Sequence, residues 1–391
     1  MARGEVPLDR SPPRRSVVAP GLVAAFALAV GASPAGGQEA TSAAPFILIR
    51  EFIYQRAPFA SAHASTLAET PSGTLLAAWF GGSAEGADDV EIRLSRHPPG
   101  GSWSPPVAVT HYPHMPTWNP VLFRDGGRTW LFFKVGPNPR EWVGAYRTSE
   151  DEGRTWSEVT YLPAGLIGPV RTKPLRLAGG TWLAGSSVEA GIRGDTPPDA
   201  PYRAWAVWVE RSTDKGRTWT KQGPIGVPGQ PYGVIQPTLW QTATGEVRML
   251  MRSTERIGRI VSASSSDGGL TWTPGTPTTL PNPNAGIDAV KLVDGRVVLV
   301  YNHLTRGRTA IHIAVSGDDG THWSPPLVLE DGQQELSYPA VIQTRDGLVH
   351  ITYTWNRTRI RHVVVDPAKL PGGAGGDALP RDLGPLRRRH P

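Results

Sequence analysis

The chain has 391 residues, with 45 glycines, 39 prolines, 14 tryptophans and a charged fraction of only 19%. Many turn-forming residues together with many large aromatics favour a sheet-rich protein with short strands over a helical one. Cysteine is absent, which excludes disulfide bonds, thiolate metal sites and a cysteine nucleophile. The net charge of +6 favours anionic partners, but part of it lies in the terminal run 387–389. A short basic tail is not a nucleic-acid motif, and no nucleic-acid partner is predicted.

Residues 1–32 have the pattern of an export signal. Arg14 and Arg15 precede an apolar stretch at 17–30 that is too short and too rich in small residues for a convincing membrane span. A small-residue cleavage pattern follows at 30–32, and the arginine pair also fits a twin-arginine signal, which directs export of a folded protein. An uncleaved anchor is the alternative. Both interpretations predict a secreted or periplasmic domain without stable membrane insertion.

An eight-residue pattern recurs four times along the chain. Each copy has a Ser two residues before an Asp, a Gly two residues after that Asp, and a Trp at its end. The pattern predicts a hairpin, because the Asp side chain bonds backbone amides just ahead of it and Gly accepts positive φ. The terminal Trp supplies a large apolar body to bury. The copies are Ser149–Trp156, Ser212–Trp219, Ser265–Trp272 and Ser316–Trp323, with a degenerate copy at 95–103.

Between these motifs lie pairs of apolar strands joined by a Gly-containing turn. Aligning the pairs places one polar residue from each at the start of its first strand, at intervals close to the length of one four-stranded blade. Six such units predict a single-domain, all-β, six-bladed propeller. We expect 45–54 to supply the outer strand of the last blade, against 359–365. The aligned residues are His63, Asn119, Lys173, Gln236, Asp288 and Tyr338.

The propeller is therefore assigned to 45–370, which contains no internal linker. Residues 33–44 are rich in Gly, Ala, Ser and Pro and predict a linker after the signal. Residues 371–391 have the composition of a disordered basic tail.

The six aligned residues are all polar or ionisable, whereas packing alone would favour apolar side chains at the axis of a propeller. Ligands of propellers bind where the ends of the innermost strands converge. For Asn119 and Gln236, the lining of a water-filled channel is an equally acceptable interpretation. The combination of Tyr338 and His63 with Lys173 and Asp288 indicates a functional site instead.

A second group of cations lies at the ends of the next strands. We expect these cations to converge with Lys173 at one end of the propeller axis. They are Lys134, Arg252 and the turn containing Arg306 and Arg308. A lone Arg is usually part of a surface salt bridge, but cations from separate blades that converge fit a carboxylate, whose geometry matches the guanidinium fork. This pattern predicts an acidic sugar as the ligand.

These motifs resemble those of the exo-sialidase (neuraminidase) family, whose propellers are built from BNR, or Asp-box, repeats. The resemblance covers nearly the whole mature chain. It implies that Tyr338, in the segment 337–339, is the nucleophile of a retaining glycosidase. It also implies a general acid/base in the loop 82–92, with Asp89 as first choice and Asp88 as second; a turn-capping role is the alternative for both. Among the arginines that bind the sugar carboxylate, the resemblance assigns the second to Arg252. The third is Arg308, with Arg306 as a fallback.

Two positions depart from the family pattern. The chain has His63-Ala64-Ser65 where the family has Arg-Ile-Pro, and Gln236 where it has the Glu that takes the proton of the tyrosine. A Gln side chain cannot act as a base, and Asp288 or Glu335 is a possible substitute. His63 is either an acid/base, because imidazole titrates near neutrality, or a hydrogen-bonded channel histidine.

The sequence therefore favours a secreted exo-glycosidase that releases sialic acid or a related acidic sugar. A propeller hydrolase or lyase acting on a uronic-acid-containing glycan, with His63 at its centre, is the alternative. A non-catalytic glycan-binding propeller is a third possibility. The histidines lack the short spacings of metal ligands, and no Gly-rich phosphate loop is present. We thus expect no metal and no cofactor; the oligomeric state cannot be read from the sequence.

Overall fold

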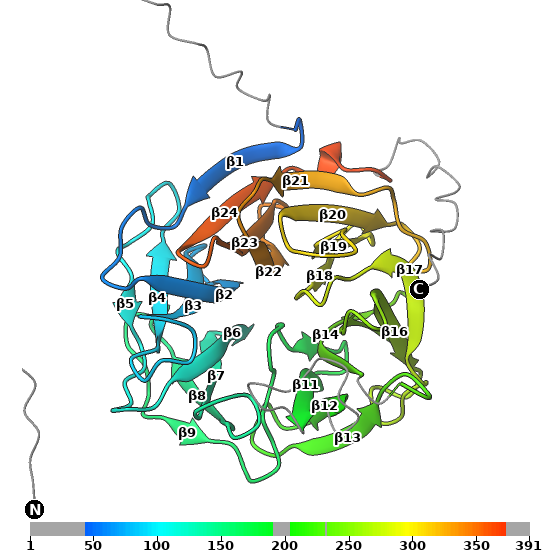
Figure 1. Cartoon of the computed structure of the whole chain (residues 1–391), viewed down its shortest axis with the longest axis horizontal. Coiled ribbons are helices and arrows are strands. Elements are labelled where there is room, and N and C mark those ends of the chain that lie inside the picture. The colour runs from blue at the N-terminus through cyan, green and yellow to red at the C-terminus, as the bar shows by residue number, and fades with distance from the viewer. Residues whose placement is uncertain (1–43, 191–203, 231–232, 373–391) are drawn as a thin grey trace, which may run out of the picture. The chain divides into compact units, whose positions relative to one another are not determined.

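The computed structural model of the chain describes residues 44–190, 204–230 and 233–372. Its strands form six sheets of four antiparallel strands each, arranged around a central axis (Figure 1). The predicted all-β, six-bladed propeller is confirmed. The predicted signal at 1–32 and nearly all of the predicted linker and tail lie outside the described residues. Within the described ranges the one helix is the 3-10 turn η1 (Pro367–Lys369), and no helix is long and apolar enough to cross a membrane.

Each blade begins with its innermost strand and continues outwards in chain order, except that the outermost strand of blade 6 is β1. Blades 1 and 2 comprise β2 (Ser61–Glu69), β3 (Leu75–Gly82), β4 (Glu91–His97), β5 (Val107–Ala108), β6 (Thr117–Asp125), β7 (Arg128–Val135), β8 (Val143–Ser149) and β9 (Thr160–Tyr161). Blades 3 and 4 comprise β10 (Leu175–Arg176), β11 (Trp182–Ala190), β12 (Ala204–Ser212), β13 (Thr220–Ile225), β14 (Val234–Gln241), β15 (Val247–Ser253), β16 (Arg259–Ser265) and β17 (Thr276–Pro281). Blades 5 and 6 comprise β18 (Asp288–Lys291), β19 (Val297–Tyr301), β20 (Ala310–Ser316), β21 (Leu327–Asp331), β22 (Leu336–Gln343), β23 (Val349–Trp355), β24 (Arg359–Val365) and β1 (Ile47–Phe52).

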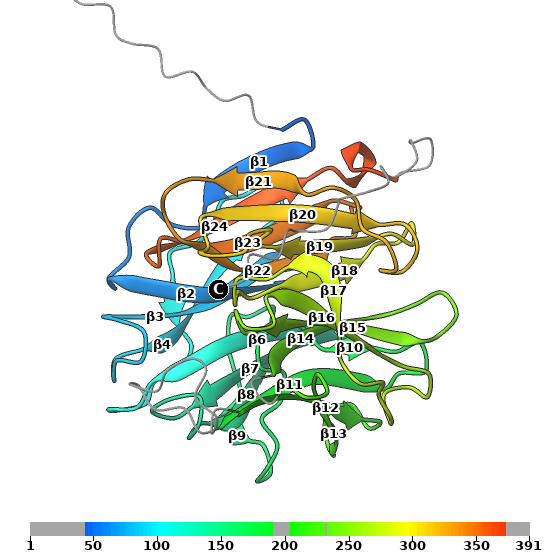
Figure 2. The same cartoon turned by 45° about the vertical axis from the view of Figure 1, so that its right-hand side comes forward.

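The ring is closed by strands from both ends of the described chain. β1 pairs antiparallel with β24, from Ile47 opposite Val365 to Phe52 opposite Arg361. Figure 1 and Figure 2 show β1, in blue, on the same side of the ring as its orange-red partner β24. The predicted closure is therefore confirmed. This pairing covers the outer edge of β24 and makes β1 the outermost strand of the last blade.

The repeated Asp motifs form the predicted hairpin turns. In the first copy, Asp151 Oδ1 accepts hydrogen bonds from Ser149 Oγ and Thr155 N, both at 2.8 Å. Gly153 has φ of 77°, and the other copies repeat this arrangement. The hydrogen bonds from Thr155 hold the pKa of Asp151 well below its usual range. These carboxylates are engaged in turns and are not free for chemistry.

The ends of the innermost strands define two faces of the propeller. In β6, Asn119 lies near the first end and Asp125 at the last, roughly 20 Å away at the usual rise of a strand. The face at the strand starts carries the candidate active site. The opposite face carries the Asp-motif turns and the turns of the inner hairpins.

Candidate active site

The inner strands of four blades carry a bulge near their start. The register shifts by one residue after His63, Trp118, Ile235 and Ser337, and the next residue in each case has a left-handed backbone. These next residues are Ala64 (φ 57°), Asn119 (41°), Gln236 (54°) and Tyr338 (53°). The sequence alignment was therefore correct for Asn119, Gln236 and Tyr338, but blade 1 places Ala64, not His63, at the equivalent position. His63 is the residue before the bulge. The alignment chose it because blade 1 has no proline after the bulge that would mark the equivalent position.

Tyr338 lies at the centre of the site and is surrounded by cations. The guanidinium carbons of Arg171, Arg252 and Arg308 lie 5.3, 5.6 and 5.6 Å from the centre of its ring. The phenol oxygen accepts a hydrogen bond of 2.7 Å from Arg252 Nη1. Tyr338 is 9% exposed, so most of its surface is covered by these neighbours. The positive charge around the ring makes this a place where an anionic group is stabilised.

Arg252 is fixed on both sides by side chains of the site. Its Nη1 also donates to Gln236 Oε1 at 3.0 Å, and its Nε donates to Asn284 Oδ1 at 2.9 Å. The guanidinium lies 5.6 Å from the centre of the Trp205 ring. Gln236 thus serves as a hydrogen-bond acceptor that orients Arg252. The predicted proximity of Arg252, Gln236 and Tyr338 is present.

A chain of ion pairs runs around the rim of the site. Arg308 donates to the Asn284 carbonyl at 2.6 Å and to Glu335 Oε1 at 3.4 Å, and Glu335 Oε2 accepts from Arg357 Nε at 2.7 Å. Arg357 continues the chain to Glu85 on the loop of blade 1. Burial alone would raise the pKa of Glu335, but hydrogen bonds from Arg357 and Ser337 and the charge of Arg308 hold it below its usual value. Glu335 is therefore an ionised partner of arginines.

Arg171 is the residue of the site that the sequence analysis missed. It lies in the irregular segment before β10, is 1% exposed, and donates from Nη2 to the carbonyl oxygens of Tyr338 and Pro339 at 2.5 and 2.8 Å. Burial lowers the pKa of Arg171 to about 10, so it remains charged at neutral pH. An Arg two residues before the Lys173-Pro174 pair was the available signal, but the alignment selected the residue before the proline.

His63 packs directly on Tyr338, with ring centres 4.3 Å apart. It is 1% exposed, and neither ring nitrogen has a hydrogen-bond partner among the described residues. Burial, together with the charges of Arg357 and the other nearby arginines, lowers the pKa of His63 well below 6.5. The imidazole is therefore neutral at physiological pH, and the same burial and positive charges disfavour its protonation.

Lys173 and Asp288 do not join this cluster as predicted. They form an ion pair with each other, with Nζ 3.0 and 2.9 Å from the two carboxylate oxygens. Asp288 also accepts from Thr238 Oγ1 and the Val341 amide, each at 2.9 Å. Lys173 lines a small cavity of about 240 Å³ with residues of the far ends of the inner strands. Asp288 has no bulge before it in β18, and its acceptor positions are occupied by links between blades.

Lys134 has the same register position in its blade as Arg252, opposite Trp118 as Arg252 is opposite Ile235. Its side chain, however, is fully buried, and its ammonium donates to the carbonyl of Pro169. Burial lowers the pKa of Lys134 to about 7. This placement does not support the prediction that Lys134 contacts the ligand, because the side chain is buried and its ammonium is bonded to a backbone carbonyl of the next blade.

Asp88 and Asp89 are both exposed, in the loop that follows β3 at the site face. The Ser83 amide lies 3.0 Å from each oxygen of Asp89, and the Ser83 hydroxyl donates at 2.8 Å. These hydrogen bonds from Ser83 hold the pKa of Asp89 below its usual value. In this arrangement Asp89 caps its own loop. The described residues contain no cluster of acidic or histidine side chains that would hold a metal ion.

The fold and the arginine-ringed tyrosine define a sialidase-like propeller. Residues 73–351 match the family described as BNR repeat-like domain, and the chain belongs to that family. No curated protein matches the chain.

Several solved structures share the fold. A protein of unknown function from Dyadobacter fermentans has 18% identity and a TM-score of 0.68, covering 83% of this chain and 100% of that one. A Hadza microbial sialidase has 22% identity and a TM-score of 0.63, covering 78% of this chain and 66% of that one. Trypanosoma rangeli sialidase has 13% identity and a TM-score of 0.60, with coverage of 79% and 55%. The chain thus spans only part of these two sialidases, and at such identities the likeness concerns the fold.

Proposed function

We propose that the chain is an exo-glycosidase of the sialidase type that releases a terminal acidic sugar. The observation that carries this proposal is the hydrogen bond of 2.7 Å between Arg252 and the phenol of Tyr338, with Arg308 also beside the ring. It brings a carboxylate-binding cation and a nucleophilic oxygen within one sugar's reach. Export would place the enzyme outside the cytoplasm, where such glycans are found.

In this proposal the reaction has two steps with retention of configuration. The carboxylate of the sugar binds Arg252 and Arg308, and Tyr338 Oη attacks the anomeric carbon. The glycosidic bond breaks, and Asp89 gives its proton to the departing oxygen. Water, deprotonated by Asp89, then cleaves the tyrosyl–sugar bond and returns the phenol. Asp89 must leave its contacts with Ser83 to do this, with Asp88 as the second candidate.

The phenol proton needs an acceptor other than Gln236. Asp288 is occupied by its four donors and Glu335 by arginines and Ser337. The neutral imidazole of His63 packs on the phenol ring and has no hydrogen-bond partner among the described residues. By elimination we assign the role of proton acceptor to His63, which requires a charge to form on an imidazole whose pKa is lowered by burial and by nearby arginines.

The same pair of residues favours a second candidate, a lyase acting on uronic-acid glycans. In such an elimination the base removes the proton beside the carboxylate, arginines stabilise the resulting charge, and a phenol protonates the departing oxygen. A neutral imidazole beside a tyrosine, and an amide in place of the family's carboxylate, fit these roles. A glycan-binding propeller without catalysis is the third candidate.

One experiment separates these candidates. The secreted form is assayed on a fluorogenic sialoside and on uronic-acid oligosaccharides, beside the Tyr338→Phe variant. Fluorophore release that the variant abolishes supports the glycosidase. Formation of an unsaturated uronate, detected by its ultraviolet absorbance, supports the lyase instead of the glycosidase. If the folded wild type binds either ligand but forms no product, the result supports a glycan-binding propeller without catalysis.

A further inference from the structure

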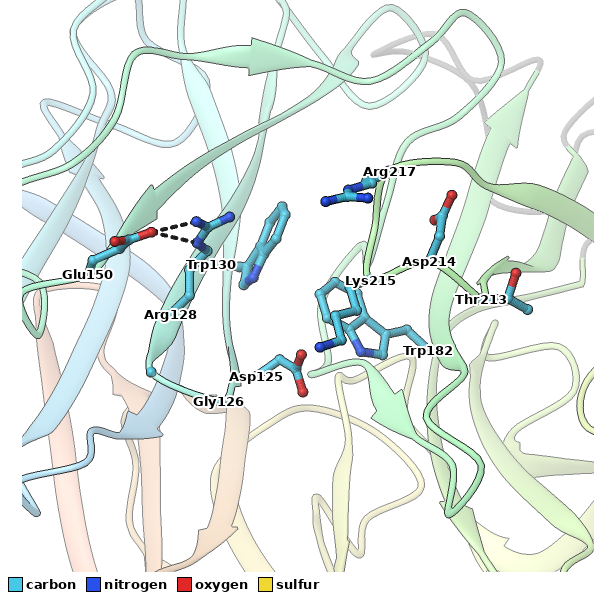
Figure 3. A pocket seen from close by; sticks show the side chains of 11 residues that line it. Asp125, Gly126, Arg128, Trp130, Glu150, Trp182, Thr213, Asp214, Lys215 and Arg217 are labelled. Carbon is cyan, nitrogen blue, oxygen red and sulfur yellow. Dashed lines mark hydrogen bonds and ion pairs between the residues drawn. The ribbon is translucent and has the colours of Figure 1, made fainter.

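A second cavity lies on the face opposite Tyr338, between blades 2 and 3. It has a volume of about 830 Å³ and is lined by the inner turn of blade 2 and the Asp-motif turn of blade 3. Figure 3 shows Trp130 standing between Arg128 on one side and Arg217 on the other. Asp125, which borders this cavity, is at the other end of β6 from Asn119. The cavity is thus separate from the tyrosine site.

The cavity exists because a contact made at other blade interfaces is missing here. Glu152, between the Asp and the Gly of its motif, accepts from the Ser72 amide and hydroxyl in the inner turn of blade 1, at 2.9 and 2.8 Å. Asp319 accepts from the Ala243 amide of blade 4 in the same way, at 3.1 Å. Blade 3 has Lys215 at this position. The facing turn of blade 2 is shorter and consists of two glycines, Gly126 and Gly127.

Two tryptophans line the cavity with little of either ring exposed, and Trp130 is the more accessible at 7%. Trp130 and Trp182 meet edge to face with ring centres 5.4 Å apart. Trp182 is 1% exposed, and its Nε1 is buried without a hydrogen-bond partner in the described part of the chain. Trp182 is thus part of the core, and only the exposed part of Trp130 can contact the C–H groups of a ligand.

The free charge of the cavity is positive. Its acidic side chains are engaged: Asp125 pairs with Arg176 at 3.3 Å, Glu150 with Arg128, and Asp214 Oδ1 accepts from Thr218 N at 2.8 Å. By contrast, the side chains of Lys215 and Arg217 form no ion pair or hydrogen bond within the described ranges. Both are exposed at the mouth of the cavity. Two unpaired cations beside aromatic walls attract a ligand that carries anionic groups.

We propose that this cavity is a second, non-catalytic binding site for an acidic saccharide. Sulfate or carboxylate groups would bind Lys215 and Arg217, and C–H groups of a sugar ring would contact the small exposed part of Trp130. This inference does not depend on the reaction proposed for Tyr338. A site on the far face would hold a long acidic glycan while its end is presented elsewhere, which adds binding energy through effective concentration.

The test is calorimetric titration of the whole secreted protein with a chondroitin sulfate tetrasaccharide, at low and moderate salt. The double variant Lys215→Ala, Arg217→Ala is expected to lose at least ~10-fold in affinity, the equivalent of ~1.4 kcal/mol. A double variant of equal charge, Arg56→Ala with Arg154→Ala, is expected to bind like the wild type, because both residues are exposed outside the cavity.

A third variant fills the cavity without removing a charge. Gly127 lines the cavity and does not have a positive φ, and a Cβ there would meet nothing within 4 Å, so the turn can accept Gly127→Phe, which adds bulk at the cavity. It is expected to abolish binding. Tyr338→Phe and Arg252→Ala are expected to retain it, whether or not the protein is a glycosidase.

Four results would overturn the proposal. No binding by the wild type at millimolar tetrasaccharide removes the site, and equal loss in both double variants indicates nonspecific charge attraction. Loss of binding in Arg252→Ala would assign the probe to the tyrosine site. Inorganic sulfate that binds as tightly as the tetrasaccharide would indicate a simple anion site and remove the saccharide.

Discussion

The guanidinium of Arg171 donates to the carbonyl oxygen of Tyr338 across 2.5 Å, joining residues 167 positions apart in the chain. Tyr338 has a left-handed backbone, with φ of 53°, which costs free energy in a residue with a Cβ. The bonds from Arg171 to Tyr338 and Pro339 compensate by fixing that backbone. The orientation of the proposed nucleophile therefore depends on blade 3 as much as on its own blade.

Replacing Arg171 tests this dependence. Arg171→Met keeps most of the volume but leaves the carbonyl oxygens of Tyr338 and Pro339 unsatisfied, so the free energy of unfolding should fall by roughly 1–3 kcal/mol. Turnover should also fall in Arg171→Met, and Arg171→Lys should retain more turnover than Arg171→Met. Urea denaturation and steady-state kinetics measure both effects. Arg154→Met, on an exposed turn, is the matched control. A variant as stable and active as the wild type would contradict this role.

Gln236→Glu tests the missing base. A carboxylate at this position would accept from Arg252, as Gln236 Oε1 does at 3.0 Å, and could also take the proton of Tyr338. If the protein is a retaining glycosidase, kcat should rise at least ~10-fold, within the usual range for a positioned base. Gln236→Met is the control and should lower activity, because Arg252 loses its acceptor. A fall in kcat in Gln236→Glu would instead support His63 as the acceptor in an elimination.

Asp89→Asn tests the general acid. The substitution should slow substrates with poorly activated leaving groups far more than those with good ones, because a good leaving group departs without a proton. Asp88→Asn makes the same change of charge on the same loop and tests the second candidate, which should show this dependence on the leaving group only if Asp89 does not. Comparing kcat/KM for an alkyl and an aryl glycoside measures the difference. An equal loss on both substrates would point to another acid.

The closing sheet predicts a dependence of stability on pH. His350 Nδ1 lies 3.0 Å from His362 Nε2, and His362 Nδ1 lies 3.0 Å from Glu51 Oε1 on β1. Burial lowers the pKa of His350 to about 4, and the charge of His362 adds to this effect. In the unfolded chain a histidine titrates near 6.5. As the pH falls from about 6.5 toward 4, the unfolded chain takes up a proton that the folded chain does not, so stability is lost.

The check is the midpoint of thermal unfolding between pH 4 and 8 for the wild type and His350→Gln. The variant should lose less stability than the wild type over the acidic part of this range. Parallel curves would show that His350 is not the group responsible.

The sequence was sufficient for the fold because the Asp motifs report local turns, and each turn has the same physical cause in every blade. It was also sufficient to bring Arg252, Gln236 and Tyr338 together, since bulges before proline mark the same position in their blades. It failed for Lys173 and Asp288, which pair with each other. Whether a polar side chain faces the ligand or bonds the backbone of the next blade, as Lys134 does, is decided by packing between residues far apart in the chain. The spacing of residues in the sequence does not indicate which of these two arrangements a polar side chain adopts.

Because β1 pairs with β24, the last blade can form only at the end of synthesis. The strand at 47–52 is made early but finds its partner only when 359–365 has been made. At about 5–20 residues per second, synthesis of the intervening chain takes roughly 15–60 s. During that interval the first strand has an open edge and blade 1 has no neighbour on one side. The ring closes only after nearly the whole chain exists, so a protein truncated before 359 would lack the pairing that joins the two ends of the chain and would leave β1 without a partner strand.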